Sequence, residues 1–252
     1  MTLLATGSWG KGALSASLVP CTFTPDDATF QRVEEAWTRA CARPGVNLFD
    51  GPLCRLERIV ATPHHLHVEL SEITYRWFFG TNGSHPHCEP RANALGTSAA
   101  LLSCDGWLVF GVRSQAVGLY PGRAHPFGGT LDPTAKPDLL DEMARELQEE
   151  IGLEAEDVEE LRCIGIGEDP LLRQPELLYL ARTRCRRDEL VTRLQGDEHG
   201  TCWCVETTRE ALEQALDDPL ATPVTHLVIA RFLALDLLPV AHVTDQKVAR
   251  HA

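Results

Sequence analysis

Two spacings of apolar residues alternate along the chain and predict a protein of mixed helices and strands. Apolar residues at every second position, or short apolar runs between turn residues, are typical of strands. Apolar residues that recur every three or four positions are typical of helices. By these patterns we expect strands at 53–60, 65–70, 161–167, 176–184 and 202–206, a hairpin at 97–113, helices at 24–41, 187–195, 208–217 and 223–238, and an acidic helix that ends at Gly152.

The order of these elements predicts an α/β fold in two parts. Residues 96–252 are expected to form an α/β/α sandwich around a mixed β-sheet, and the hairpin around Asp105-Gly106 would open that sheet. Residues 1–95 are expected to form an N-terminal α+β extension. The boundary therefore falls near residue 95.

The extension is expected to contain one amphipathic helix and two strands. Thr24 is the predicted N-cap of the helix at 24–41. Its expected buried stripe consists of Phe30, Val33, Trp37 and Ala40. In the strand at 65–70, His65 and His67 alternate with apolar residues, so we interpret them as part of a solvated face.

The acidic helix carries three carboxylates on one side. At about 100° per residue, Glu146, Glu149 and Glu150 fall within roughly a third of the helix circumference. Gly152 ends the helix, as a glycine after the last turn commonly does. The separate apolar stripe consists of Leu140, Met143, Ala144, Leu147 and Ile151. The helix is therefore anchored on one side and acidic on another.

The charge pattern argues against a merely solvated face. Glu142, Glu146 and Glu150 follow one another at i,i+4 spacing, and such like-charge pairs destabilise a helix by a few tenths of a kcal/mol each. A divalent cation would reverse that penalty. Mg²⁺ takes oxygen ligands and binds where one or two protein carboxylates meet substrate phosphates.

The stretch Arg145-Glu146-Leu147-x-Glu149-Glu150-x-Gly152-Leu153 resembles the second half of the Nudix box and matches it at every fixed position. The first half departs from the pattern. Gly129 lies two residues too far from Arg145, and Pro137 occupies the position of a glutamate. Asp138, shifted by one residue, is the stand-in that we expect for that supporting acidic position.

The resemblance implies a Nudix hydrolase that uses Mg²⁺, with Mn²⁺ as an alternative. It implies that Glu146, Glu149 and Glu150 hold the metal, together with the backbone carbonyl of Gly128 or Gly129. Either Glu149 or Glu150 would serve as general base, and the sequence does not distinguish them. The remaining catalytic residue of the motif, Arg145, is expected to orient the carboxylates.

Three further strings resemble the branch of the family that hydrolyses UDP-sugars: Leu48-Phe49-Asp50-x-Pro52-x-x-Arg55-Leu56, Tyr75-Arg76-x-Phe78-x-Gly80-Thr81-Asn82 and Leu95-Gly96-x-x-Ala99-Ala100-Leu101. This resemblance implies attack of water on the diphosphate of UDP-glucose or UDP-galactose, releasing UMP and a sugar 1-phosphate. Two alternatives stay open. One is a Nudix enzyme for ADP-ribose, a dinucleotide or coenzyme A, and the other is a non-catalytic nucleotide-sensing module.

The segment at 74–82 mixes aromatic side chains with an arginine and ends in turn residues. One interpretation is a wall that stacks on the base and contacts phosphate; the other is a buried element that leads into a loop. Under the first, Tyr75 would stack on uracil, Arg76 or Arg113 would contact a phosphate, and Thr74 or Asn82 would bond the uracil edge. Phe127 and Gly128, in the glycine-rich loop at 121–129, are also expected to lie against the substrate.

The composition of the chain limits the classes of molecule that it is expected to bind. The net charge of −13 disfavours nucleic-acid polymers, because their binding relies on clustered lysine and arginine. A small nucleotide needs only a local group of arginines and metal ions. We expect no membrane association, because the apolar run at 227–240 is too short and is interrupted by charges. The N-terminus lacks a charged segment followed by an apolar core, so we expect a cytoplasmic protein. The oligomeric state does not follow from the sequence.

Cysteine usage fits that compartment. The nine cysteines are expected to be reduced thiols. Cys202-Trp203-Cys204 lacks the two-residue spacing of zinc ribbons, and His85-Pro86-His87-Cys88 is interpreted as a loop. Zinc is therefore not expected.

Overall fold

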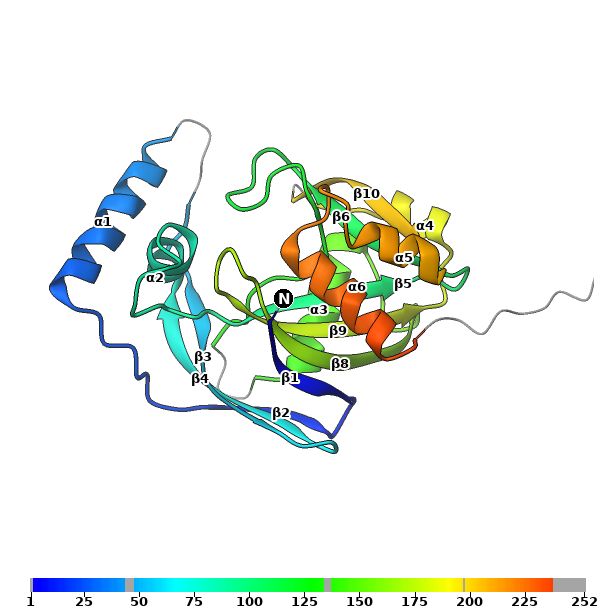
Figure 1. The fold of residues 1–252 in the computed structure, drawn as a ribbon, viewed down its shortest axis with the longest axis horizontal. Helices are drawn as coiled ribbons and strands as arrows, with labels where there is room; N and C mark the ends of the chain where they lie inside the picture. Colours follow the sequence, from blue (N-terminus) through cyan, green and yellow to red (C-terminus); the bar gives the residue numbers. More distant parts are fainter. Residues whose placement is uncertain (1, 44–47, 134–136, 197, 238–252) are drawn as a thin grey trace, which may run out of the picture.

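A seven-stranded mixed sheet forms the centre of the protein (Figure 1). The computed structural model describes residues 2–43, 48–133, 137–196 and 198–237. Its strands are β1 (Thr2–Trp9), β5 (Gly96–Leu102), β6 (Trp107–Arg113), β7 (Ala124–His125), β8 (Val158–Glu168), β9 (Pro175–Thr183) and β10 (His199–Glu206). They lie in the order β1-β8-β9-β5-β6-β10, with β7 paired to β6. The β5–β9 pair is parallel and the other pairs are antiparallel.

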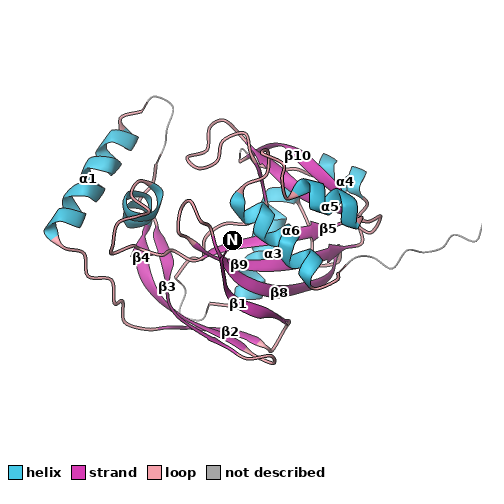
Figure 2. Cartoon of the chain, in the orientation of Figure 1, coloured by secondary structure: helices cyan, strands magenta, loops and turns pink. Residues whose placement is uncertain are grey.

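Helices cover both faces of this sheet, as the sequence predicted (Figure 2). Strand β9 shows why, because successive side chains of a strand point to opposite faces. Leu177 and Tyr179 pack with helix α3 (Leu139–Ile151), whereas Leu178 packs with helix α6 (Pro223–Ala234). Helices α4 (Arg187–Thr192) and α5 (Arg209–Ala215) complete the two layers. The expected α/β/α sandwich is confirmed.

The predicted hairpin is present as β5 and β6. Gly106 adopts a φ of 84°, a left-handed conformation that glycine reaches without steric cost. Leu101 pairs with Val109 and Leu102 with Leu108. Every strand and helix predicted within 96–252 is present, and residue 238, the predicted end of the last helix, lies outside the described residues.

A second sheet holds much of the N-terminal part. It contains β2 (Leu14–Leu18), β4 (Leu66–Thr74) and β3 (Pro52–Ala61) in that order. Strand β1, however, pairs with β8 at the edge of the large sheet, and the Arg231 guanidinium of α6 donates to the carbonyl oxygens of Gly7 and Ile164. Strand β1, which the sequence did not predict, thus lies within residues 1–95 but belongs to the large sheet.

Helix α1 (Asp27–Cys41) differs from its prediction at its start and on its buried face. Asp26, rather than Thr24, is the N-cap, and its carboxylate accepts a hydrogen bond from the Thr29 amide at 2.8 Å. Phe30 is 51% exposed, because the helix turns Val33 toward the chain at Gly80 instead. The expected burial of Val33 and Ala40 is confirmed, that of Phe30 is wrong, and Trp37 is half-buried.

The aromatic segment continues from β4 into helix α2 (Tyr75–Phe78) and a π-helical turn, η1 (Phe79–Gly83). Within the described part of the chain, no helix is both long and apolar enough to span a membrane.

Candidate functional site

Helix α3 carries the acidic motif and is capped at both ends. The Asp138 carboxylate accepts hydrogen bonds from the amides of Leu140 and Asp141 at 3.0 and 3.2 Å. Gly152 ends the helix in the left-handed conformation, with φ of 63°, as predicted. Asp138 is therefore the N-cap of α3, and its Oδ1 accepts both hydrogen bonds, while its expected role as the supporting acidic residue stays a prediction. Ala144, predicted in the apolar stripe, is exposed.

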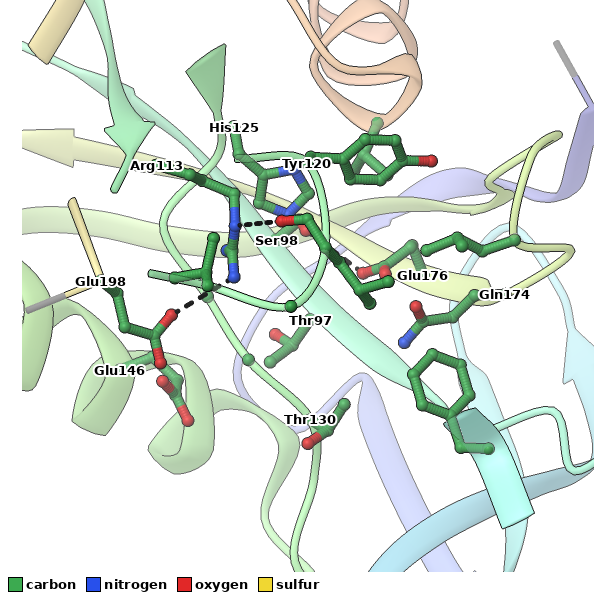
Figure 3. A pocket seen from close by; sticks show the side chains of 18 of the residues that line it. Thr97, Ser98, Arg113, Tyr120, His125, Thr130, Glu146, Gln174, Glu176 and Glu198 are labelled. Atoms are coloured by element: carbon green, nitrogen blue, oxygen red, sulfur yellow. Dashed lines mark hydrogen bonds and ion pairs between the residues drawn. The ribbon is translucent and has the colours of Figure 1, made fainter. Parts of the chain in front are cut away.

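A cavity of about 610 Å³ opens beside α3 (Figure 3). Arg145, Glu146 and Glu149 line one end of it. The glycine loop, strands β5, β6 and β9, the loop at 114–122 and the turn at 169–174 line the rest. The N-terminal part contributes Leu48, Phe49, Tyr75 and Phe78. Three residues of the acidic motif thus line the cavity, and both parts of the chain contribute to its wall.

Arg145 joins the carboxylates of the motif. Its guanidinium donates to Glu146 at 2.6 Å, to Glu149 at 2.7 Å and to Glu142 at 3.1 Å. Burial raises the pKa of Glu146 to about 7; the Arg145 charge opposes that rise, and the carboxylates of Glu150 and Glu149 add to it. Negative charge is therefore crowded at this end of the cavity despite the arginine.

Glu150 points away from the cavity into the protein. It is buried, its Oε2 accepts a hydrogen bond from the Gly128 amide at 2.7 Å, and its Oε1 lies 3.0 Å from His199 Nε2. Glu198, exposed and lining the cavity, lies beside this pair. Ligand atoms of Glu150, Glu198 and His199 all lie within 4.8 Å of one another.

Sequence reasoning missed Glu198 and His199. The expected strand began at residue 202, whereas β10 begins at His199 and brings this pair beside α3. A lone His next to a Glu carries no spacing signal of its own. Only the pairing of β10 with β6, where Gly111 leaves room for the His199 ring, places them at the site.

The paired glycines are required by close packing. Gly128 has a φ of 151°, and a Cβ there would collide with the Thr97 carbonyl oxygen of β5. A Cβ at Gly129 would come within 2.9 Å of the Glu146 carboxylate. The Gly129 carbonyl oxygen accepts a hydrogen bond from the Thr97 amide at 2.8 Å, and a carbonyl oxygen retains a second lone pair. The loop thus lies between the sheet and the acidic end of the cavity.

Three of the predicted substrate residues, Tyr75, Arg113 and Gly128, line the cavity. The Tyr75 ring contacts Trp37 and Phe79, with centroids 6.1 and 6.3 Å away. The Arg113 guanidinium donates to the Leu119 carbonyl oxygen at 3.0 Å and lies 3.6 Å from Glu198.

Arg76 and Asn82, which were also predicted to contact the substrate, do not line the cavity and are held by other contacts. Arg76 is paired with Glu34 at 3.0 Å and with Asp50 at 3.3 Å. Asn82 is fully buried, and its amide donates to the carbonyl oxygens of Leu172 and Arg173.

Phe127 and Thr74 also lie away from the cavity. Phe127 is fully buried in the core and contacts the His199 ring edge-on, with centroids 5.4 Å apart. Thr74 ends β4, and its side chain does not line the cavity. The segment at 74–82 is therefore mainly structural, with Tyr75 and Phe78 as its cavity-lining members.

The end of the cavity away from α3 holds polar groups of a different kind. Ser98, Tyr120, His125, Asp169, Gln174 and Glu176 line it (Figure 3). We call this set the neutral recess. Burial raises the pKa of Glu176 to about 8, helped by the Asp169 charge, and burial lowers the pKa of His125 well below its ordinary value. Burial thus favours the uncharged form of both groups at neutral pH.

Comparisons with known proteins yield only remote likenesses. No family model matches the chain, and no curated protein matches it. Solved structures that it resembles include the MutT protein from Methanosarcina mazei Go1, at 16% identity and a TM-score of 0.40 over 57% of this chain and 94% of that one. The Nudix domain of Shewanella oneidensis NrtR, complexed with ADP ribose, has 16% identity and a TM-score of 0.43 over 61% and 98%. A Nudix-family hydrolase from Clostridium perfringens has 14% identity and a TM-score of 0.37 over 58% and 99%. Neither a substrate nor an activity of this chain follows from likenesses at this level.

Proposed function

We propose that this chain is a Mg²⁺-dependent hydrolase of the Nudix type that cleaves the diphosphate of a nucleoside diphosphate derivative. One observation carries the proposal: the half-motif that resembles the Nudix box forms a capped helix whose Arg145, Glu146 and Glu149 line a large cavity. A volume of about 610 Å³ falls within the range of small-molecule sites. A solvated helix face would need neither this cavity nor the glycine packed against Glu146.

The donor set suits a hard divalent cation. Glu146, Glu149 and Glu150 are the proposed ligands, and Glu198 joins them because its carboxylate lies beside that of Glu150. Burial raises the pKa of Glu146, the carboxylates of Glu150 and Glu149 add to that rise, and a cation would favour the charged form of this group. When bound, Mg²⁺ would place positive charge at the diphosphate oxygens and acidify a water molecule.

The protein's own groups have distinct proposed tasks. Arg145 holds Glu146 and Glu149 in position and limits their mutual repulsion. The Gly128 amide and His199 fix the orientation of Glu150. Arg113 lies between Glu198 and the neutral recess, where its charge can face a phosphate. A diphosphate ester resists attack because of its negative charge, so cationic groups at the phosphates lower the barrier.

The proposed substrate is a UDP-sugar, such as UDP-glucose or UDP-galactose, with UMP and a sugar 1-phosphate as products. This finer assignment rests on the three strings that resemble the UDP-sugar branch. Leu48, Phe49, Tyr75 and Phe78 come from these strings and line the cavity, which supports it. ADP-ribose, a dinucleotide and coenzyme A are the competing substrates.

The test is a screen of purified protein against these compounds with Mg²⁺, read as phosphate released by an added phosphatase. We expect turnover of UDP-sugars above the others, and none with the Glu149→Gln variant, which controls for contaminating hydrolases. Turnover of another member of the panel would overturn the UDP-sugar assignment alone. Absence of turnover, together with no rise in melting temperature on adding Mg²⁺ and nucleotide, would overturn the hydrolase and favour a sensing or structural role.

A further inference from the structure

The neutral recess differs in composition from the rest of the cavity. Ser98, Asp169, Gln174 and Glu176 are each no more than 5% exposed, yet all four line the cavity. The polar atoms of this set that have no protein partner keep some exposure to the cavity, so a ligand in the cavity can supply the partner.

The wall of the recess is held in a fixed position. Tyr120 adopts a positive φ of 52°, which is uncommon for a non-glycine residue and is sustained only by surrounding contacts. Its hydroxyl donates to Asp169 Oδ2 at 2.6 Å, and its ring stacks on that of His125, with an interplanar angle of 24°. Asp169 also accepts from the amides of Leu171 and Leu172. The loop at 114–122 is thereby tied to the turn at 169–174 across the recess.

Hydrogen bonding assigns the tautomer of His125. The Thr225 hydroxyl donates its single proton to the Ala124 carbonyl oxygen at 2.8 Å. For the 3.0 Å contact between the Thr222 and Thr225 hydroxyls to be a hydrogen bond as well, Thr222 is the donor. We assign the proton of the neutral His125 ring to Nδ1, 2.9 Å from the Thr222 hydroxyl, because this tautomer lets all three contacts be hydrogen bonds. In the neutral ring this leaves Nε2 as a bare acceptor, and among the described residues it has no hydrogen-bond partner.

Glu176 supplies the complementary donor. Ser98 donates to its Oε2 at 3.2 Å, and within the described chain its Oε1 has no hydrogen-bond partner. The side chain lies over Gly96, where a Cβ would collide with the carboxyl group. A carboxyl group that is uncharged at neutral pH keeps its proton and can donate it. Gln174 adds an amide, which can donate and accept.

We propose that the neutral recess binds the nucleobase of the substrate, with His125 Nε2 accepting from a base N–H and the Glu176 carboxyl group donating to the neighbouring carbonyl or ring nitrogen. This inference rests on the proposed function for the identity of the ligand as a nucleotide. It places base recognition at β5, β7 and β9 of the sandwich instead of at the N-terminal aromatic segment.

A nucleobase fits the recess better than the other parts of a nucleotide sugar. A base has two apolar faces and a few polar edge atoms, which match the aromatic wall of Tyr120 and the free groups of His125, Glu176 and Gln174. A hexose would bring several hydroxyls and leave some buried without partners. A phosphate would meet an acceptor nitrogen there. The diphosphate would instead extend past Arg113 toward the acidic end.

The test measures binding of uridine, cytidine, adenosine and guanosine without metal, by calorimetry at millimolar concentrations. Glu176→Gln keeps a donor and an acceptor of the same shape, whereas Glu176→Met keeps the volume and removes both. We expect at least one nucleoside to bind, Glu176→Met to weaken its Kd by about tenfold or more, and Glu176→Gln to retain most of the affinity. His125→Phe removes the acceptor, keeps a planar ring and should give a similar loss if Glu176→Met fails to fold.

Calorimetry with glucose 1-phosphate is the comparison. Three results would overturn the inference: no nucleoside binds, a folded Glu176→Met variant binds nucleosides like the unmodified protein, or these variants lose affinity for glucose 1-phosphate instead of for nucleosides. Because nucleoside binding is measured without Mg²⁺ or turnover, failure of the hydrolase proposal is detected separately. For whichever substrate is turned over, KM should rise in Glu176→Met by about the same factor while kcat changes little.

Discussion

Two buried glutamates, one behind the acidic end of the cavity and one in the neutral recess, are held differently. Glu150 of α3 receives hydrogen bonds from the Gly128 amide and His199. Glu176 of β9 receives one bond, from the Ser98 hydroxyl, and burial raises its pKa to about 8. Donors favour the charged form of a carboxyl group, whereas burial without enough of them favours the neutral form. The same residue type is thus held by two hydrogen-bond partners at the acidic end and by one in the neutral recess, where burial favours its uncharged form.

This difference divides the work proposed for the site. The acidic end suits a cation and the diphosphate that it would bind, while the neutral recess suits a planar uncharged ring. Arg113, which faces Glu198 at 3.6 Å, lies between the two. A nucleotide derivative has the same order of parts: base, diphosphate and the group beyond it.

The largest effect on turnover is expected for Glu149→Gln at the acidic end. We expect kcat to fall by at least about two orders of magnitude, because one ligand charge is lost from the cluster. The side chain is 58% exposed, so the melting temperature should stay unchanged. Near-normal turnover in this variant would remove Glu149 from the proposed metal site.

Glu150→Gln should lower turnover as strongly and also destabilise the fold. The variant cannot accept from both the Gly128 amide and His199, so the free energy of unfolding should fall by about 1–3 kcal/mol. The helix pattern alone does not distinguish Glu150 from Glu149 in this respect, and the burial of Glu150 does. Urea unfolding of Glu150→Gln and Glu149→Gln measures the difference between their free energies of unfolding.

Glu176→Gln tests the neutral end through pH. The folded pKa, about 8, lies above the ordinary value of 4.5, so the stabilising contribution of the protonated group is fully present below pH 4.5 and is lost as pH rises to about 8. The glutamine variant lacks this loss. The free energy of unfolding of the variant minus that of the unmodified protein should therefore be larger at pH 8 than at pH 4.5, by an amount on the order of a few kcal/mol.

Urea unfolding at both pH values checks this prediction. The raised pKa of Glu146 contributes to the pH dependence of both proteins, so it cancels in the difference. A stability difference that is the same at pH 4.5 and pH 8 would mean that Glu176 is charged in the folded protein.

The acidic end could be predicted because its signals are local. Glu146, Glu149 and Gly152 lie within two helical turns, and helix geometry alone places the carboxylates together. The sandwich was predictable for the same reason, since each strand and helix carries its own spacing. Strand β1 was missed because its residues lie mostly exposed at a sheet edge and show no clear alternation.

The neutral recess could not be predicted, because it forms only when distant segments meet. Ser98 and Glu176 face each other through the parallel β5–β9 pairing, and Tyr120 reaches Asp169 across two loops. Asn82 shows the opposite error. Its residue type suggested a substrate contact, but the direction of its side chain depends on the turn at 172–173. A sequence shows which polar groups exist, and tertiary packing decides which of them a ligand can reach.

A smaller effect is expected at Asp138, which separates a helix cap from a support for the acidic end. Asp138→Ala should lower the free energy of unfolding by about 1 kcal/mol through loss of the cap. Asp138→Asn keeps a capping oxygen and removes the charge, so both stability and kcat should stay near normal. A fall in kcat in Asp138→Asn would restore the role of supporting acidic residue that its position before the motif suggested.

The smallest effect is expected at Tyr75, and it decides between the two places where a base could bind. The Tyr75 ring lines the cavity but packs against Trp37 and Phe79, so its removal should mainly loosen that aromatic cluster. If the base lies in the neutral recess, Tyr75→Leu should raise KM by no more than about threefold, well below the rise in Glu176→Met. A base stacked on Tyr75 would lose about 1–3 kcal/mol, which is roughly fivefold or more in KM. Kinetics of both variants on one substrate, with melting temperatures as the control for folding, therefore compare the two sites directly. A larger rise in KM for Tyr75→Leu than for Glu176→Met would place base recognition in the N-terminal part and leave Glu176 as a buried structural acid.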